Sequence, residues 1–222
     1  MPIEIGRAEE KIRSIPKLDH SGRPPGVRPG DGQLRTLHPN LPSAGSTAVW
    51  VGIAAISMTF AGLTSAMVVR QGSGMDWQRL ALPNVLFLNT LILVASSFTL
   101  EMFRRRFPAA PGTGSPAAED VTWWLYGTLG LGVLFLAGQY LAWHQLRMEG
   151  LYLASNPSSS FFYVLTAAHA LHLLGGMAGL LYILYKTQKR ILRASALNVA
   201  AKYWHFMAVL WIYLLALIWI KI

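Results

Sequence analysis

The sequence contains no cysteine, which excludes disulfide bridges, zinc ribbons, iron–sulfur clusters and thiol catalysis. It is also poor in charge, because only 13% of its 222 residues are charged, against about 25% in a typical soluble domain. Hydrophobic residues make up 53% of the chain. So little charge cannot cover so much apolar sequence with a polar surface, and the bilayer is therefore the expected solvent of this protein.

Residues 1–44 lack any apolar run, and they hold seven of the chain's 12 prolines together with seven basic residues. Prolines at the density seen in Ser21–Asp31 are incompatible with a helix interior or a central strand. A signal peptide would need a continuous apolar core of about 7–15 residues, which this segment does not contain. We expect an extended, largely disordered basic tail over residues 1–44, followed by a membrane domain over residues 45–222.

Five apolar stretches of about 21–26 residues follow this tail, separated by polar connectors, most of which contain glycine or proline. A helix needs about 20 residues to cross the hydrocarbon core of a bilayer. The sequence therefore predicts an all-α membrane protein built as a bundle of five transmembrane helices. The predicted spans are residues 47–69, 83–103, 121–143, 160–185 and 198–220.

Basic residues are distributed unevenly between the two sides of this bundle. Fifteen of the 19 Lys and Arg belong to the tail, the second and fourth connectors and the start of the last span, which share one side, and four belong to the other side. Because cytoplasmic loops carry the excess of Lys and Arg, we predict a cytoplasmic N-terminus and, after five spans, a C-terminus outside. Topology thus explains the net charge of +9, and we expect no nucleic-acid partner.

Three histidines lie within the predicted spans, where ionisable side chains are costly and count as candidate functional residues. His169 and His172 are three residues apart and share one face of the fourth span. His205, in the last span, is preceded by Trp204. We interpret the three histidines as structural groups that form hydrogen bonds between helices.

The face that carries His169 and His172 continues through Gly176 and Gly179. Gly175 and Gly179 have the small-residue spacing that lets two helix backbones approach closely. This face is therefore predicted to pack against another helix and not against lipid.

Glu101 is the acidic residue within the predicted spans, and Arg104 and Arg105 follow it three and four residues later. Glu placed before Arg at this spacing is the favourable order for an ion pair on a helix. A transmembrane proton path normally strings several Asp, Glu and His across the bilayer. We therefore predict an interfacial ion pair here and not a proton carrier.

The sequence contains no Gly-rich phosphate loop, nucleophile elbow or metalloprotease pattern. We accordingly predict no catalytic residue or metal site of these kinds in this chain. One alternative stays open at this point, because haem ligation needs only one or two axial His per haem, usually paired across two helices. His169 or His172 together with His205 would make the chain a haem-binding membrane cytochrome of the cytochrome b kind.

Longer motifs lie in the last two spans. Residues 158–176 read SSSFFYVLTAAHALHLLGG, with a Phe pair and a Thr-x-x-His-x-x-His-x-x-Gly pattern, and residues 202–211 read KYWHFMAVLW. Both segments resemble signatures of subunit III of haem–copper respiratory oxidases, the second being its final-helix Tyr-Trp-His-Phe motif. The Asn-Thr and paired Ser of Pro83–Glu101, and the segment Phe60–Gly62, are also similar to that family. The resemblance covers residues 47–222 and leaves the tail unmatched.

The resemblance implies the five-span bacterial form of this family, an accessory subunit that carries no haem or copper. It implies packing on subunit I, which holds the haems and the copper, with subunit II completing the core, and it implies bound phospholipid. The expected complex, most simply a cytochrome c oxidase, reduces oxygen to water with proton translocation in aerobic respiratory electron transport. The implied location is the bacterial inner membrane, as a multi-pass protein. The electron donor and membership of a larger respiratory supercomplex stay open.

Two acidic residues of the family pattern are missing. Aligned on Phe60–Gly62, the family's Glu falls near Ile56, and the Asp that follows its Trp-His-Phe motif falls at Ala208. The resemblance therefore implies no role based on those carboxylates for this chain, whereas helix packing and lipid binding do not need them.

Overall fold

The computed structural model describes residues 44–73, 77, 82–107 and 117–221, so the predicted tail lies outside the described part except for its last residue. The described helices are α3 (Ala44–Ser73), α4 (Val85–Arg106), α5 (Ala117–Met148), α6 (Pro157–Gln188) and α7 (Ala194–Lys221). All five are long and apolar enough to cross a membrane. The predicted fold class, an all-α protein with five membrane-spanning helices, is confirmed, and the orientation of the termini stays a prediction.

Each helix continues beyond its predicted span at one end or at both. Helix α5, for example, has 32 residues and continues past Trp143 through His144 and Arg147. At a rise of about 1.5 Å per residue such a helix is about 48 Å long, whereas the hydrocarbon core is about 30 Å thick. Its polar ends therefore fall in the headgroup region, so the apolar stretch stops before the helix does.

A short connection turns the chain from α5 into α6. Gly150 has a φ of 79°, the left-handed conformation that commonly ends a helix and that glycine adopts without strain. Asn156 then caps α6, because its Oδ1 accepts a hydrogen bond from the backbone N–H of Ser159 at 2.8 Å. Pro157 follows at the start of the helix, where its missing N–H costs nothing. The two helices consequently run antiparallel as neighbours.

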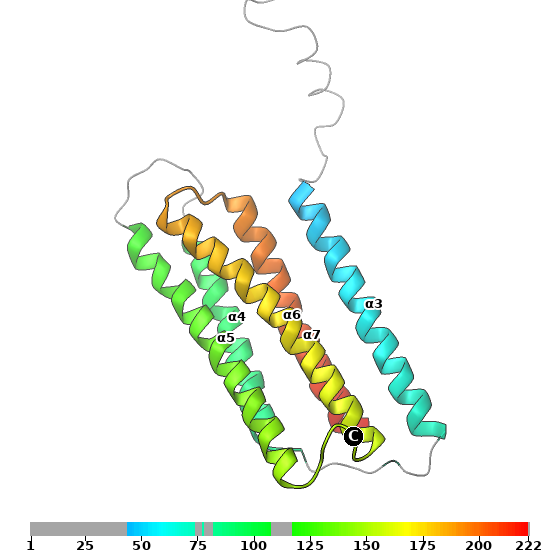
Figure 1. Cartoon of the computed structure of the whole chain (residues 1–222). Helices are drawn as coiled ribbons and strands as arrows, with labels where there is room; N and C mark the ends of the chain where they lie inside the picture. Colours follow the sequence, from blue (N-terminus) through cyan, green and yellow to red (C-terminus); the bar gives the residue numbers. More distant parts are fainter. Residues whose placement is uncertain (1–43, 74–76, 78–81, 108–116, 222) are drawn as a thin grey trace, which may run out of the picture. The chain divides into compact units, whose positions relative to one another are not determined.

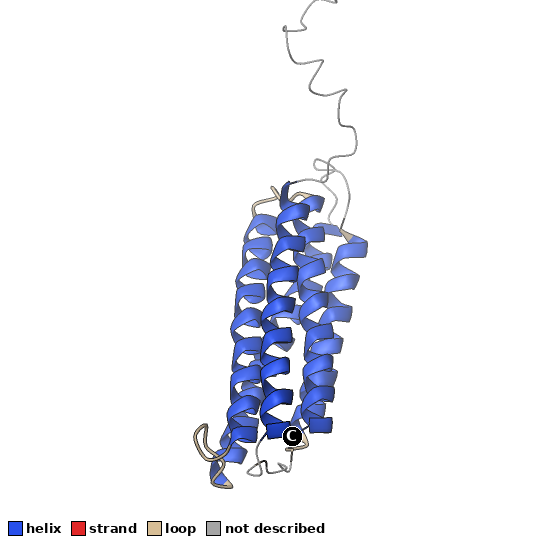
Figure 2. Ribbon diagram, turned by 90° about the vertical axis from the view of Figure 1, so that its right-hand side faces the viewer, coloured by secondary structure: helices blue, strands red, loops and turns tan. Residues whose placement is uncertain are grey.

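Helices α4, α5, α6 and α7 pack around one another, as Figures 1 and 2 show. Each of these four contacts two others of the group, in the pairs α4–α5, α5–α6, α6–α7 and α4–α7. Helix α3 lies beside the group and, within the described residues, contacts α7 and α6 only. Helices α6 and α7 therefore have three helix neighbours each: α6 lies against α3, α5 and α7, and α7 lies against α3, α4 and α6.

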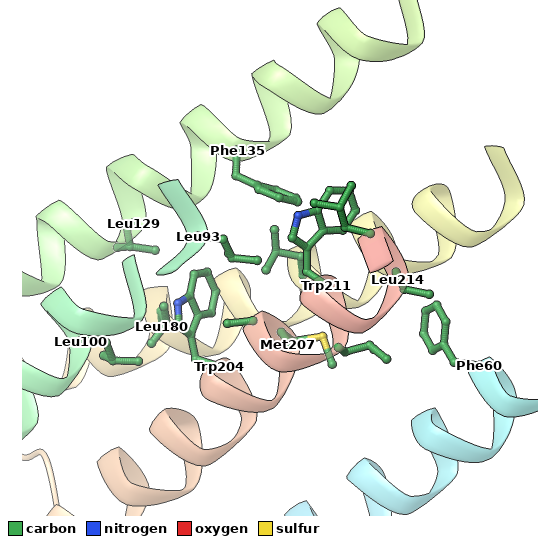
Figure 3. Packing of buried hydrophobic residues seen from close by; sticks show 14 of the residues in the cluster. Phe60, Leu93, Leu100, Leu129, Phe135, Leu180, Trp204, Met207, Trp211 and Leu214 are labelled. Carbon is green, nitrogen blue, oxygen red and sulfur yellow. The ribbon is translucent and has the colours of Figure 1, made fainter. Parts of the chain in front are cut away.

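Two tryptophans of α7 fill the centre of the core. Trp204 and Trp211 are each 1% exposed, and Figure 3 shows them among leucines of α4, α5 and α6. The ring of Phe135 from α5 stands edge-on to Trp211, with 4.9 Å between the centroids. Phe60 reaches toward α7 from α3 and is also fully buried. Aromatic side chains of α3, α5 and α7 therefore contribute to this core.

The two ends of the bundle differ in charge. Arg104 at the end of α4 donates a hydrogen bond to Oδ1 of Asn198 near the start of α7, at 3.3 Å. At the opposite end, Gln71 and Trp77 donate hydrogen bonds to the backbone oxygen of Lys221, at 3.1 and 2.9 Å. One end carries the described basic residues Arg104, Arg105, Arg106, Lys186, Lys189, Arg190, Arg193 and Lys202. This arrangement agrees with the asymmetry on which the predicted topology depends.

Candidate functional site

The intramembrane histidines are the first candidates. His169 on α6 is fully buried, and its ring lies 5.9 Å from that of Phe135 and 5.1 Å from that of Trp211, centroid to centroid. Neither ring nitrogen has a hydrogen-bond partner among the described residues. The side chain is thus enclosed by aromatic rings from α5 and α7.

His172 lies on a different side of α6 and points toward α3. Its Nδ1 is 2.7 Å from the backbone oxygen of Ala168, one turn earlier in the same helix. Its ring lies 5.8 Å from that of Phe60. The backbone oxygen of His172 accepts a hydrogen bond from the hydroxyl of Tyr203 at 2.9 Å, which links α6 to α7. In this arrangement the link between the helices uses the main chain of His172 and not its imidazole.

The three candidate glycines have different surroundings. A Cβ at Gly176 would lie 2.9 Å from Cε1 of Tyr203 and 3.3 Å from Cε3 of Trp204, so a side chain has no room there. Gly175 has the hydroxyl of Tyr203 at 4.0 Å, and a Cβ at Gly179 would meet nothing within 4 Å. Within the described residues, the close approach of α6 and α7 therefore occurs at Gly176.

Glu101 on α4 forms the centre of a charged cluster. Arg104 donates to both carboxylate oxygens at 2.7 Å, and Nε of Arg105 donates to Oε1 at 2.7 Å. The carboxylate is only 18% exposed. Nε2 of His205 on α7 lies 3.6 Å from Oε2 of Glu101. The predicted residues are therefore together. His205 is an additional neighbour that residue spacing could not predict, because it lies on another helix.

The directions of the three histidine side chains can be compared with what haem ligation requires. The rings of His169, His172 and His205 face three different neighbours, namely Trp211, Phe60 and Glu101. A bis-histidine site requires two imidazoles that face each other across a haem. Facing three different neighbours, the three imidazoles are not arranged as such a pair.

The positions of the missing acids are occupied by apolar residues. Ile56 is partly buried on α3 and packs against the core, and Ala208 on α7 is 6% exposed. Ala208 therefore belongs to the packed interior, where a carboxylate would need a partner.

The sequence did not predict a pocket that lies at the end of the bundle opposite the one with most of the described basic residues. It has a volume of about 280 Å³. Trp143, Arg147, Leu153, Tyr163, Val164 and Ala167 line it. The hydroxyl of Tyr163 donates to the backbone oxygen of Leu151 at 2.9 Å, and the indole of Trp143 donates to Oγ1 of Thr166 at 3.0 Å. These bonds fix two aromatic side chains beside the exposed cation of Arg147, a combination that suits an amphipathic ligand.

Comparisons with known proteins agree with the fold. A family model described as cytochrome c oxidase subunit III matches residues 51–221. The chain is 32% identical over 207 residues to a probable cytochrome c oxidase subunit 3 of Nocardia farcinica, which covers 86% of this chain and 95% of that protein. It is 30% identical over 200 residues to a cytochrome c oxidase subunit 3 of Synechocystis sp., which covers 86% of this chain and 81% of that one.

Proposed function

Because the chain belongs to the cytochrome c oxidase subunit III family, we propose that it is an accessory subunit of a haem–copper terminal oxidase in a bacterial inner membrane. In this role it packs on subunit I, with subunit II completing the core. It supports sustained reduction of oxygen to water coupled to proton translocation. The observation that carries the proposal is the family match, which spans all but the first turns of the five-helix bundle.

The chemistry of the described polar residues fits a structural role better than a catalytic one. Glu101 is held by two arginines, and Trp204 and Trp211 donate their indole protons to Ser96 and Thr90 of α4 at 3.0 Å. Interhelical hydrogen bonds of this kind stabilise a bundle by about 0.6 kcal/mol each on average. These groups fix helix positions. On the family assignment, we expect the haem and copper in the partner subunits.

We further propose that the pocket beside Arg147 binds a phospholipid. Arg147 lies in the last turn of α5, where the helix leaves the apolar layer, and its guanidinium can pair with a phosphate. The exposed Val164 and Ala167 of α6 border the same pocket and offer an apolar surface to an acyl chain. Tyr163 and Trp143 line the same pocket, and aromatic residues are common at a membrane interface.

A purification through this subunit tests the assignment. A tagged chain expressed from its own locus is expected to co-purify chains that carry haem and copper, and the complex is expected to show oxidase spectra. The tagged chain isolated from those partners is expected to show no Soret band. A Soret band on the isolated chain, lost in a His169→Ala or His205→Ala variant, would support the cytochrome b alternative and contradict the accessory role.

A further inference from the structure

Three buried amide and imidazole side chains in the core have polar atoms that no described residue satisfies. Asn89 on α4, Gln139 on α5 and His169 on α6 are each at most 1% exposed. The atoms without a hydrogen-bond partner among the described residues are Nδ2 of Asn89, Oε1 and Nε2 of Gln139, and both ring nitrogens of His169. Three helices thus each contribute one such side chain.

Gln139 and His169 lie at the same level of the bundle. Gln139 is four residues from Phe135 and four from Trp143, so the three share one stripe of α5. Phe135 packs on the ring of His169, with 5.9 Å between centroids, and Trp143 donates to Thr166 at 3.0 Å. Gln139 therefore faces α6 between Thr166 and His169.

Asn89 approaches the same level from α4. A Cβ placed on Gly138 would lie 2.0 Å from Oδ1 of Asn89 and 3.0 Å from its Nδ2. The carboxamide thus rests directly on the α5 backbone, at the residue before Gln139, and the absence of a side chain at Gly138 is what admits it.

Trp211 of α7 packs against His169 from the remaining helix of the group, but it offers no hydrogen bond to the unpaired polar atoms of His169, Gln139 or Asn89. Its ring lies 5.1 Å from that of His169, and its only donor is used, because Nε1 bonds Oγ1 of Thr90 at 3.0 Å. Figure 3 shows Trp211 and Phe135 meeting at this level of the core. The hydrocarbon surroundings supply no water from outside, so buried donors and acceptors in a membrane protein must be satisfied within the protein.

We propose that Asn89, Gln139 and His169 form a binding site for ordered water inside the membrane-spanning bundle. The set contains amide donors, an amide oxygen, and an imidazole that in its neutral form has one donor and one acceptor. A site for an anion would present hydrogen-bond donors, and a site for a cation would present acceptors. Water both donates and accepts, which matches the mixed set found here. Buried waters typically make about three hydrogen bonds, and three side chains border this site.

A density map of the complete oxidase complex at a resolution that shows waters tests the site directly. We expect at least one water within about 2.7–3.2 Å of polar atoms from two of the three side chains. Direct hydrogen bonds between Gln139 and His169, with no water between them, would overturn the proposal.

Variants provide a second test, because the temperature at which the subunit leaves the complex is expected to fall if the site holds water and to rise if it is dry. Gln139→Met keeps the side-chain volume and removes the amide, so the bound water loses one hydrogen-bond partner. We therefore expect the dissociation temperature of the subunit to fall by about 2–4 °C. In a dry site the same change removes an unsatisfied amide and would raise that temperature, which contradicts the proposal. Gln145→Met, at an exposed position of α5, is the matched control and is expected to have no effect. If the Gln139 variant does not assemble, the wild-type map decides.

Discussion

The indole N–H of Trp204 on α7 donates a hydrogen bond to Oγ of Ser96 on α4, with 3.0 Å between the two atoms. The same hydroxyl lies 3.4 Å from the backbone oxygen of Thr128 on α5, which accepts from it. One serine thus joins three helices in the centre of the core. The next residue, Ser97, has a buried Oγ with no partner among the described residues. The two adjacent serines therefore form a matched pair for mutation.

Ser96→Ala is expected to destabilise the bundle because it leaves the indole proton of Trp204 buried and unpaired. The penalty for an unsatisfied buried donor is about 1–3 kcal/mol, which corresponds to a fall in melting temperature of about 2–4 °C per kcal/mol for a chain of this size. Ser97→Ala removes an unpaired hydroxyl and is expected to be neutral or slightly stabilising. Thermal dissociation of the purified complex measures both, and equal effects would contradict the assigned roles.

Gly176→Leu is expected to weaken retention of the subunit by the complex. Its side chain must displace Tyr203 and Trp204, and overpacking of this kind typically costs about 1–3 kcal/mol. Gly179→Leu is the control on the same helix, since nothing lies within 4 Å of its Cβ position. The yield of subunit in the purified oxidase reports both variants. A larger loss for the Gly179 variant would mean that this face of α6 contacts another subunit.

The predicted topology can be tested with cysteine labelling, which has no background because the chain contains no cysteine. Cysteine at Ser115, in the second connector, is expected to be protected from an impermeant thiol reagent in intact cells. Ser73 and Ser155, both exposed and at the other end of the bundle, are expected to react when replaced by cysteine. The reverse pattern would place the N-terminus outside.

The charged cluster predicts resistance to a hydrophobic carbodiimide, which modifies protonated carboxyl groups within the membrane. Two arginines bond the Glu101 carboxylate at 2.7 Å and stabilise its ionised form. We expect no adduct on this chain in the treated complex, and loss of proton pumping, where it occurs, should come from another subunit. Mass spectrometry locates the adduct. Arg104→Gln combined with Arg105→Gln should make Glu101 reactive, and stoichiometric labelling of the wild type would indicate a proton-handling role.

The proposed lipid site depends on the cation at its edge. Arg147→Gln is expected to reduce the amount of phospholipid that co-purifies with the complex, because one charge near anionic headgroups contributes about 1 kcal/mol. Arg190→Gln, an exposed cation at the opposite end, serves as the control. Lipid extraction followed by quantitative mass spectrometry compares the two, and equal retention would exclude Arg147 as a headgroup ligand.

The sequence predicts the five helices well because span length and apolar content are local properties. It predicts the Glu101 cluster in part, since Arg104 and Arg105 are one turn away on the same helix, whereas His205 comes from α7. It also groups Gly176 with Gly179, although only the first meets a neighbouring helix. A stripe of one helix shows which residues share a face, and the crossing point with the next helix decides which of them touch it.

The fit of Asn89 onto Gly138 is a further relationship that sequence patterns do not reveal. A buried amide and a glycine in another helix are unremarkable separately, and their meaning depends on the register between α4 and α5. Register follows from the packing of whole helix faces and not from either residue alone.

The bonds from Gln71 and Trp77 to Lys221 have a consequence for biosynthesis. Among the described helices α3 is the first to be made, yet its neighbours are α6 and α7, which are the last. During translation α3 must therefore wait in the bilayer while α4 and α5 are inserted, before its first neighbour α6 follows. Its long lipid-compatible surface, with Trp50, Met58 and Val69 exposed, allows that delay. The two hydrogen bonds to Lys221 can form only when α7 is complete, so they mark the point at which the five described helices have all come together.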